Sequence, residues 1–398
     1  MINSNFMEKL LEVGEVEWKA LSEVGELVRG NGLPKTDFTE YGIPAIHYGQ
    51  IYTYYGTFTT ETKSFVSYET AKKLKKVDTG DVVITNTSEN LEDVGKSVVY
   101  LGKVQAVTGG HATIFKPSNQ ILGKYFAYYT QTDMFARQKR KYAKGIKVID
   151  VSATDMSKII IPIPPLKVQE EIVRILDTFS ELTAELTAEL TAELIVRKKQ
   201  YTYYRDNLLT FDEEEVGWKP LGELADIGVG SKPEMIYRNI QSYEYINAGT
   251  TNSGYSNNFN CDGDTVTTPS RGQGGIGFVG YQKDRFWLGP LCYKIKAKKH
   301  MNIISKYLYY FLQANNYLIL GLKKEGGVPA VNRGDLIKLN IPIPPLEEQA
   351  RIVSILDKFD TLTSSITEGL SCEIELRQKQ YEYYRKMLLS FPNEEVEA

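Results

Sequence analysis

The sequence predicts an α+β protein made of two copies of one unit, each a globular domain of mixed helices and strands followed by a long helix. The main observation is a duplication: residues 161–211 match residues 341–391 at 28 of 51 positions, without a gap and at a constant shift of 180. Both copies open with IPIPPL and close with a tyrosine-rich segment, RKKQYTYYRDNLLTF in the first and RQKQYEYYRKMLLSF in the second. A repeated unit predicts a pseudo-twofold arrangement of the two halves.

A second, shorter repetition lies at the start of each unit. EVEWKAL at residues 15–21 returns as EVGWKPL at 215–221, and the linker FDEEEV at 211–216 restarts as FPNEEV at 391–396. A unit that ends where it begins favours a closed arrangement with neighbouring termini.

Length and composition are those of an ordinary globular protein. With 398 residues, 42% of them hydrophobic and 24% charged, the chain can hold two or three cores. No apolar run approaches the ~20 residues that span a bilayer, and MINSNFMEKLLEVGEVEW carries Glu where a signal peptide needs an apolar run. We therefore expect a cytoplasmic protein without a membrane segment. The cysteines and histidines have no paired spacing, which predicts neither disulfides nor a metal site: Cys261, Cys292, Cys372, His47, His111 and His300.

The net charge of −3 is unevenly distributed. Residues 14–166 hold 19 Lys and Arg against 16 Asp and Glu, and residues 212–346 hold 15 against 13. The helical segments 167–211 and 347–391 each hold 6 against 8. The globular parts are thus mildly basic and the helices acidic, which permits a polyanionic partner without requiring one.

Each repeat predicts a long amphipathic helix that begins after a Pro-Pro pair. Pro164-Pro165 ends the strand-like IIIPI and suits the first turn of a helix. Apolar residues then follow helical spacing in both copies: Ile172, Ile175, Leu176, Phe179, Leu182 and Leu186, and again Ile352, Ile355, Leu356, Phe359, Leu362 and Ile366. A helix that continues to about residue 209 is roughly 65 Å long. Since both copies carry the same stripe, we expect the two helices to pair as an antiparallel coiled coil.

The first helix contains three tandem TAEL tetrads at Thr183–Leu194. Each tetrad adds ~6 Å of helix and rotates the leucine stripe by ~40°. A solvated helical spacer is the plainest interpretation. The alternative is that the tetrads set a length, because recognition modules on B-DNA move by ~3.4 Å and ~34–36° per base pair.

The globular parts, about 14–160 and 212–340, have the same order of segments although their sequences differ. β-Branched and aromatic runs bounded by Gly and Asn predict strands, and residues 121–138 and 303–320 predict helices.

The difference in residue number between matching segments of the two copies falls from 200 to 183. This predicts an insertion of about 17 residues in the first copy, between Tyr55 and Gly80. Helix N-cap patterns precede both repeats, at Ser152-x-x-Asp155 and Asn332-x-x-Asp335.

Familiar catalytic and nucleotide-binding motifs are absent from the sequence. GQGGIG at 272–277 has the spacing of a dinucleotide loop, but the strand-like FVGYQK follows where a helix is needed, so we predict a glycine loop. VGKS at 94–97 lacks the glycine that would complete a phosphate loop, because residue 90 is Asn. No amino-methyltransferase motif, nuclease cluster, Ser-His-Asp triad or metal constellation emerges.

Clusters of cations are the first candidates for contact with a partner. Six lie within eleven residues, namely Arg137, Lys139, Arg140, Lys141, Lys144 and Lys147, and smaller groups are Lys72, Lys73, Lys75 and Lys76, and Lys323 and Lys324. Each could be an ordinary solvated helix end. The functional interpretation is contact with DNA phosphates, which sets register without recognising sequence.

Sequence recognition would instead need Arg, Asn, Gln, Ser or Thr in loops that meet base edges. Two segments occupy equivalent places after a Gly-Asp strand and differ strongly between the copies. They are Thr85-Asn86-Thr87-Ser88 and Ser270-Arg271-Gly272-Gln273, from which we select Asn86, Ser88, Ser270, Arg271 and Gln273 as candidate base contacts.

The whole pattern resembles the DNA-specificity subunit of Type I restriction-modification systems. IPIPPL followed by KVQEEIVRILDTF (167–179) or EEQARIVSILDKF (347–359) carries the resemblance, and the TAEL tetrads are similar to one branch of the family. The resemblance implies four segments: target-recognition domain 1 at 1–160, a spacer helix at 161–211, target-recognition domain 2 at 212–340, and a second spacer helix at 341–398.

The resemblance also implies that this chain has no catalysis of its own and holds no cofactor. It implies partners that bring their own cofactors. The chain would bind double-stranded DNA, two methyltransferase subunits that use S-adenosylmethionine, and restriction subunits that use ATP and Mg. It would direct them to a bipartite asymmetric sequence. The spacer helices would separate the domains and contact those subunits, with candidate residues Leu182, Leu186, Leu190, Leu194, Tyr201, Tyr204, Tyr381 and Tyr384.

Two other functions remain compatible with the sequence. One is a stand-alone DNA-binding regulator that uses the same two domains. The other is a coiled-coil scaffold whose globular parts bind peptides or glycans, which the small net charge permits.

Overall fold

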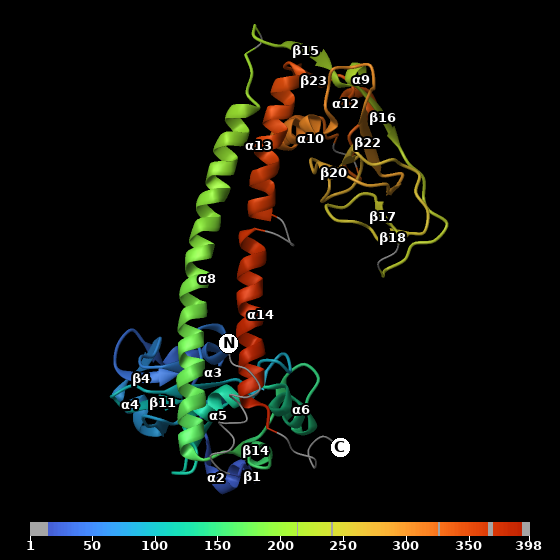
Figure 1. Cartoon of the computed structure of the whole chain (residues 1–398). Helices are drawn as coiled ribbons and strands as arrows, with labels where there is room; N and C mark the ends of the chain where they lie inside the picture. Colours follow the sequence, from blue (N-terminus) through green and yellow to red (C-terminus); the bar gives the residue numbers. More distant parts are fainter. Residues whose placement is uncertain (1–14, 213, 240–241, 325–326, 365–368, 392–398) are drawn as a thin grey trace. The chain divides into compact units, whose positions relative to one another are not determined.

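The protein forms two compact units in a computed structural model (Figure 1). The described residues are 15–212, 214–239, 242–324, 327–364 and 369–391. Unit 1 joins the chain up to Thr187 to the chain from Leu376 onwards, and unit 2 is Ala188–Glu375. Each unit therefore combines one globular domain with the end of a long helix that comes from the other half of the sequence.

Unit 1 has two five-stranded sheets, with strand orders β2-β12-β8-β10-β5 and β3-β6-β4-β11-β7. Two short pairs, β1 with β14 and β9 with β13, are antiparallel. The strands are β1 (Glu17–Ala20), β2 (Gly25–Arg29), β3 (Phe38–Thr39), β4 (Ile43–Ile46), β5 (Phe58–Thr59), β6 (Ser64–Val66), β7 (Lys75–Val77), β8 (Val82–Thr85), β9 (Thr87–Ser88), β10 (Ser97–Tyr100), β11 (Ala106–Thr108), β12 (Ala112–Pro117), β13 (Ile149–Asp150) and β14 (Ile160–Ile163).

The helices of unit 1's globular part are short: α2 (Leu21–Val24), η1 (Lys35–Asp37), α3 (Tyr48–Thr53), α4 (Tyr68–Lys73), α5 (Gly123–Tyr129), α6 (Asp133–Tyr142) and α7 (Ala153–Met156). The helix predicted over 121–138 is in fact two helices, because the Thr132 hydroxyl accepts the backbone N–H of Phe135 and starts α6 anew. Ser152 caps α7 as predicted, accepting the N–H of Asp155.

Unit 2 has a four-stranded sheet, β16-β22-β19-β20, and a three-stranded sheet, β18-β17-β21. Its strands are β15 (Gly217–Pro220), β16 (Ala225–Val229), β17 (Tyr243–Ile246), β18 (Tyr255–Ser256), β19 (Thr265–Pro269), β20 (Gly280–Gln282), β21 (Trp287–Leu288), β22 (Cys292–Ala297) and β23 (Asn340–Ile343). Its short helices are α9 (Leu221–Leu224), α10 (Ser305–Ala314), α11 (Asn316–Gly321) and α12 (Arg333–Leu336). Asn332 stands at the N-cap of α12 as predicted, but its side chain makes no capping hydrogen bond.

The two globular parts share a common framework. The order β2-β12-β8-β10 in unit 1 corresponds to β16-β22-β19-β20 in unit 2, and each unit adds a parallel pair, β4 with β11 or β17 with β21. Between Tyr55 and Gly80 unit 1 carries β5, β6, α4 and β7, where the insertion was predicted. The glycine loop also agrees with prediction, since residues 272–277 form turns before β20.

The long helices differ between the copies. α8 (Leu166–Leu208) is continuous over 43 residues. The prediction of an equally continuous second helix is wrong, because α13 (Leu346–Ser364) ends and α14 (Leu370–Leu389) begins after Gly369. Gly369 has a φ of +87°, which is outside the helical region and accessible mainly to glycine. Ile366, predicted to lie on the apolar stripe, is outside the described residues.

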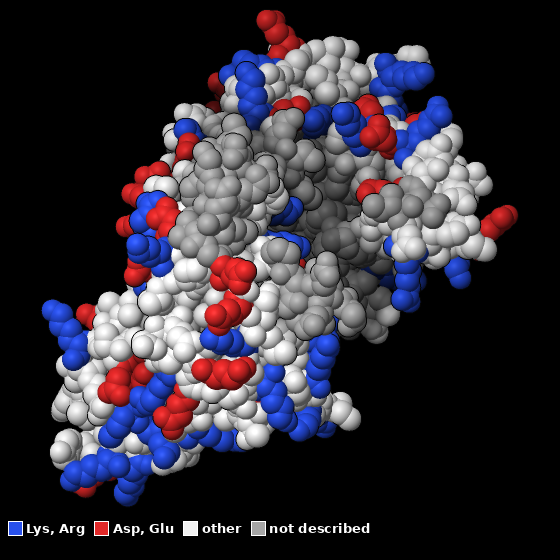
Figure 2. All heavy atoms as spheres, turned by 60° about the horizontal axis from the view of Figure 1, so that its bottom comes forward, with Lys and Arg blue, Asp and Glu red and all other residues white. Residues whose placement is uncertain are grey.

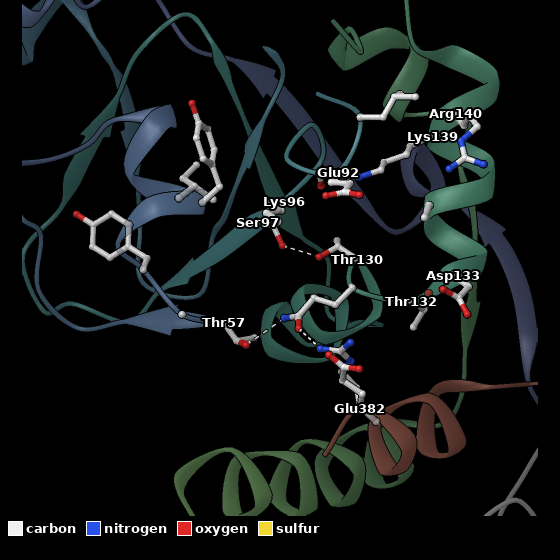
Figure 3. Close-up of a pocket in the computed structure, with 18 residues that line it drawn as sticks. Thr57, Glu92, Lys96, Ser97, Thr130, Thr132, Asp133, Lys139, Arg140 and Glu382 are labelled. Carbon is white, nitrogen blue, oxygen red and sulfur yellow. Dashed lines mark hydrogen bonds between the residues drawn. The ribbon is translucent and has the colours of Figure 1, made fainter. Parts of the chain in front are cut away.

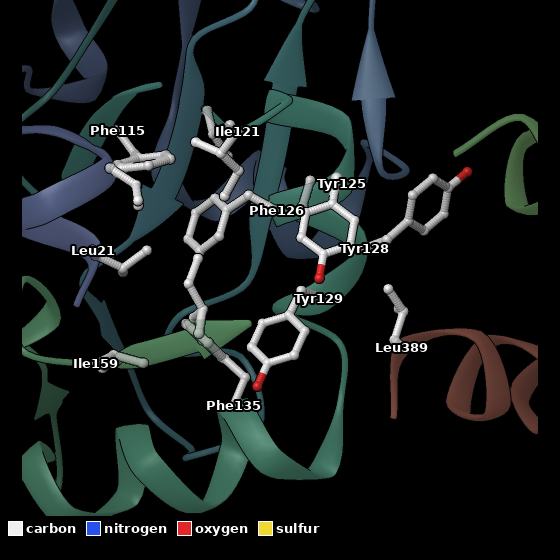
Figure 4. Packing of buried hydrophobic residues seen from close by; sticks show 14 of the residues in the cluster. Leu21, Phe115, Ile121, Tyr125, Phe126, Tyr128, Tyr129, Phe135, Ile159 and Leu389 are labelled. Atoms are coloured by element: carbon white, nitrogen blue, oxygen red, sulfur yellow. The ribbon is translucent and has the colours of Figure 1, made fainter. Parts of the chain in front are cut away.

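In each unit the domain core extends onto two helix ends. In unit 1 the cluster around Tyr128 and Tyr129 includes Leu176 from the start of α8 and Leu389 from the end of α14 (Figure 4). In unit 2 the equivalent cluster includes Leu356 from α13, Leu209 from the end of the α8 segment, and Tyr310. Burial of these apolar residues attaches the helices to both domains.

A buried glutamine fixes the start of each long helix. Gln169 accepts the N–H of Leu122 at 2.9 Å and donates to the carbonyls of Gln120 and Pro164 at 2.9 and 2.8 Å. Gln349 repeats this set with Ile304, Asn302 and Pro344 at 2.9, 2.9 and 2.8 Å. Both side chains are fully buried, so every hydrogen bond replaces one to water. The glutamine that the repeat motif retains therefore serves to join helix and domain.

Within each unit the two helix segments run antiparallel, as the sequence predicts. In unit 1 Ser180 donates a hydrogen bond to the Tyr381 hydroxyl at 2.9 Å, and Phe179 stacks on Tyr384. In unit 2 Tyr204 stacks on Phe359. Residue numbers rise along one helix as they fall along the other.

Among the described residues, no helix combines the length and apolar character needed to cross a membrane. The expectation of neighbouring termini concerns residues 1–14 and 392–398, which lie outside the described part of the chain.

Candidate nucleic-acid interface

The predicted basic cluster lies on α6 and the turn that follows it. Phe135 and Gln138 bury one face of α6, and Gln138 exchanges two hydrogen bonds with the backbone of Ile160 in β14. Arg137, Arg140 and Lys141 are exposed on α6, and Lys144 and Lys147 are exposed in the turn that follows it. These five side chains remain candidates for phosphate contact.

Lys139 does not belong to this exposed set, which corrects its assignment as a phosphate contact. Its side chain is only 7% exposed, and its ammonium donates to the carbonyls of Glu92 and Val94. Burial, with the nearby charge of Lys96 as a smaller cause, lowers the pKa of Lys139 to about 8. The amine thus holds the turn between β9 and β10 in place.

A polar cavity of about 590 Å³ lies beside Lys139 and Arg140 in unit 1 (Figure 3). Gln131 lines the cavity. Its side chain donates a hydrogen bond to Thr57 at 3.1 Å and accepts one from Arg385 at 2.7 Å. The cavity therefore lies where the domain meets the end of α14. The sequence analysis did not predict it.

Lys144 and Lys324 occupy equivalent positions in the two units, 180 residues apart. Lys144 pairs with Asp155 at 2.9 Å, and Lys324 pairs with Asp335, also at 2.9 Å. Hydrogen bonds from Lys144 and Lys158 lower the pKa of Asp155. Lys323, the neighbouring candidate, is exposed. The structural repeat therefore begins before residue 161, where the gap-free sequence match begins.

The smaller lysine cluster lies on α4 and β7, within the insertion of unit 1. Lys72 is exposed, pairs with Glu69 at 3.0 Å and lies 4.6 Å from the ring centroid of Tyr68. Lys73 is also exposed, and its carbonyl accepts the side-chain amide of Asn31.

The segment 85–88 is not the exposed loop that the sequence predicts. Thr85 ends β8, and Thr87 and Ser88 form β9, paired with β13. All four residues are buried, and neither polar atom of the Asn86 side chain has a hydrogen-bond partner among the described residues. The partner strand closes over this segment, so Asn86 and Ser88 present no free edge to a base in this conformation.

The equivalent segment of unit 2 is more open. Ser270 is buried and held by backbone bonds to Leu291 and Val331, as Asn86 is held by His111 and Val151. This equivalence places Arg271 where unit 1 has Thr87. Arg271 and Gln273 are exposed, so both remain candidate base contacts.

The spacer candidates separate into packed and exposed residues. Leu186, Leu190, Leu194, Tyr201, Tyr381 and Tyr384 are half-buried, while Tyr204 is 46% and Leu182 55% exposed. Placing Leu182 on the packed face is wrong, because alternating steps of three and four residues after Phe179 bring Thr183 there instead. Tyr203 and Tyr383, which the sequence analysis missed, are 65% and 64% exposed at equivalent positions.

Charge on the visible surface is mixed. In Figure 2, Lys and Arg side chains are interleaved with Asp and Glu, and several cations gather along the lower edge of the view. The described residues contain no group of three or more His, Cys, Asp or Glu able to hold a metal ion. The exposed cations of α6 and of the turn after it are the candidates for contact with a polyanion.

The comparisons with known proteins agree with this arrangement. The family model described as "Type I restriction modification DNA specificity domain" matches residues 14–195 and 213–376, so the chain belongs to that family. The Escherichia coli Type I restriction enzyme EcoR124I/EcoR124II specificity subunit is 36% identical, over 100% of this chain and 99% of that protein. The Escherichia coli EcoprrI specificity subunit is 33% identical, over 92% of this chain and 93% of the other.

Solved structures support the fold. The S subunit of a Type I restriction-modification system from M. genitalium matches with a TM-score of 0.54 at 17% identity, covering 95% of this chain and 97% of that one. The HsdS subunit from Thermoanaerobacter tengcongensis matches with a TM-score of 0.54 at 15% identity, covering 94% and 95%. The predicted fold class, two mixed α/β domains with long antiparallel helices, is confirmed.

Proposed function

We propose that this chain directs a DNA methyltransferase, and a restriction partner, to a bipartite asymmetric sequence in double-stranded DNA. Residues 1–160 and 212–340 would each recognise one half-site. Residues 161–211 and 341–398 would set the unread gap between the half-sites. In this proposal the chain performs no catalysis.

The supporting observation is one framework that carries two different recognition segments. β8 and β19 hold equivalent places in their sheets, and the residue that follows each is bonded to equivalent backbone partners. The next position differs in chemistry: it is Thr87 in unit 1 and Arg271 in unit 2. Thr87 is buried and its hydroxyl is bonded to the His111 ring, whereas Arg271 is exposed. The two domains would therefore present different groups to DNA, which suits two different half-sites.

The exposed cations suit the same partner. Arg137, Arg140 and Lys141 on α6 of unit 1, and Lys323 beyond α11 of unit 2, are exposed on the globular parts. Contacts of this kind add affinity without sequence preference, and they weaken as salt concentration rises.

The two copies of the helical motif present equivalent exposed residues, which suits two identical protein partners. Tyr203 and Tyr383 are exposed to nearly the same extent on the two copies of one helical motif. Exposed aromatic side chains are frequent anchors of protein interfaces. We infer that two methyltransferase subunits dock here, in the cytoplasm, and supply S-adenosylmethionine chemistry on a flipped adenine, while restriction subunits supply ATP and Mg.

Co-expression with a Type I methyltransferase subunit, followed by sequencing of the methylated genome, tests the proposal. We expect one methylated motif with two defined half-sites and an undefined gap. Specific DNA binding without methylation by an active partner would indicate a stand-alone regulator. Assembly with other proteins but no DNA binding would indicate a scaffold.

Exchange of one domain tests modular recognition. Replacing residues 14–160 with the corresponding domain of a relative should change one half-site of the methylated motif and leave the other intact. A change in both half-sites would contradict the assignment of one domain to each.

A further inference from the structure

A tight turn next to each recognition segment displays an exposed valine at the same place in both units. In unit 1 the backbones of Lys144 and Asp150 exchange two hydrogen bonds, of 2.9 and 2.8 Å. In unit 2 Lys324 and Ala330 do the same at 2.9 and 3.2 Å. We call residues 144–150 of unit 1, and Lys324 with residues 327–330 of unit 2, the valine turns.

The valines themselves are equivalent and equally exposed. Val148 is 59% and Val328 57% exposed, and they lie 180 residues apart in the repeat. Ile146, at the tip of the first turn, is 97% exposed. Contact with water is unfavourable for these side chains, so their burial against a partner would be favourable.

In unit 1 the close return of the chain requires a glycine. Gly145 has a φ of +104°, and a Cβ there would lie 2.0 Å from the carbonyl oxygen of Val148. Only glycine fits so close a return of the chain. Ion pairs from Lys144 to Asp155 and from Lys324 to Asp335 attach each turn to the helix that follows.

Each turn is joined to the proposed recognition segment. Ile149 and Asp150, directly after Val148, pair with Ser88 and Thr87. In unit 2 Ala330 forms the corresponding bridge with Arg271. Val148 and Val328 therefore lie two residues before Asp150 and Ala330, whose partners Thr87 and Arg271 differ in chemistry.

Exposed lysines precede the valines in sequence in both units, which favours a nucleic-acid occupant over a protein or lipid core. Lys147 directly precedes Val148, and Lys141 lies a few residues earlier; all three side chains are exposed. Lys323 and Lys324 precede Val328 and are exposed as well. An apolar tip flanked by phosphate-binding cations is the arrangement by which proteins insert side chains between base pairs.

We propose that the valine turns act as wedges, with Val148 and Val328 each pressing against one base step of a half-site and partly unstacking it. This inference depends on the proposed DNA-binding function and adds to it a part that does not recognise sequence. A residue that stays the same where its neighbours differ suits a task common to both half-sites, namely deformation of the duplex. Local unstacking would also lower the cost of extruding a nearby adenine for the methyltransferase.

The test uses the full chain in complex with its methyltransferase subunit, bound to a duplex that carries the methylated motif. 2-Aminopurine replaces, in turn, each purine other than the methylated adenine, because its fluorescence rises when it unstacks. We expect a rise at one step in each half-site. Val148→Ala should abolish the rise in one half-site, Val328→Ala in the other, and each should weaken binding by on the order of 10-fold.

Matched controls exist in both units. Val104 is 58% and Val229 51% exposed away from the turns, so Val104→Ala and Val229→Ala should keep both signals. Val148→Ile should keep the rise, since the wedge stays apolar. An unchanged rise in both alanine variants overturns the wedge while the proposed function stands. Loss of the methyltransferase from the complex also overturns it, by showing a protein contact. Failure to find any bipartite motif removes both proposals.

Discussion

Phe179 stacks on Tyr384 with ring centroids 5.1 Å apart and planes 3° from parallel. One repeat later the partners exchange helices: Phe359 stacks on Tyr204 with centroids 5.6 Å apart and planes at 28°. In each pair the phenylalanine lies 13 residues after the leucine that begins its helix, Leu166 or Leu346, and the tyrosine lies near the end of the other helix. Each unit therefore contains one such Phe–Tyr stack. The repeat that contributes the phenylalanine in one unit contributes the tyrosine in the other, as a pseudo-twofold requires.

Removing one ring of the unit 1 stack should destabilise the chain. We expect Phe179→Ala to lower the free energy of unfolding by about 2 kcal/mol, less than for a fully buried ring because Phe179 is half-buried. Tyr384→Ala should couple to it by about 0.5–1.5 kcal/mol in a double-mutant cycle. Urea unfolding measures both values. Leu182→Ala, at a 55% exposed position on the same helix as Phe179, should change stability by less than about 0.5 kcal/mol.

Substitution of either buried glutamine should lower the free energy of unfolding by more than the loss of one hydrogen bond would. Gln169→Leu keeps a similar volume but leaves the N–H of Leu122 and the carbonyls of Gln120 and Pro164 without their partner. We expect a loss of about 2–4 kcal/mol by urea unfolding, and a similar loss for Gln349→Leu. Gln378→Leu is the control, because Gln378 is exposed on α14 and should be near neutral. Equal effects at positions 169 and 378 would refute the docking role.

The repeat made much of this fold predictable. Two copies of one apolar stripe implied a paired, antiparallel arrangement, and the shift in register located the insertion that holds α4. The glycine loop was predicted because a strand, not a helix, follows residue 277. Local patterns sufficed wherever the structure is determined by neighbours in sequence.

Residues decided by tertiary contacts were not predictable in the same way. Lys139 looks like its exposed neighbours, yet α6 turns it under the carbonyls of Glu92 and Val94. The polar segment ending at Ser88 looks like a loop, but pairing with β13 makes it a buried strand. The valine turns could have been found from the match of Lys144, Val148 and Asp155 to residues 180 positions later, had the repeat been extended upstream.

The buried amine of Lys139 should give a specific dependence of stability on pH. Its pKa in the folded chain is lowered to about 8, while an exposed lysine titrates near 10.4. Between these values the unfolded chain binds more protons, so the stability contributed by this group increases as pH rises from about 8 to 10.4. The free energy of unfolding of wild type, relative to Lys139→Met, should therefore increase by roughly 3 kcal/mol across that window.

A matched variant isolates the effect. Lys139→Gln also removes the amine, so the difference between wild type and Lys139→Gln should rise over the same pH window as the difference from Lys139→Met. Urea titrations at several pH values measure both differences. A flat profile for Lys139→Met would mean that the amine is solvated in the folded chain.

The boundary between the two units falls inside the TAEL tetrads, between Thr187 and Ala188, and this makes the tetrads a direct test of the spacing hypothesis. Deleting Thr191–Leu194 removes ~6 Å and one step of ~40° from α8 without touching either domain. That change is nearest to one base pair of B-DNA in rotation, so we expect the unread gap of the methylated motif to shorten by about one base pair while both half-sites are retained. Replacing the same four residues with four alanines keeps the length and should keep the gap. A motif with an unaltered gap after the deletion would show that α8 does not set the spacing, even if both domains recognise DNA as proposed.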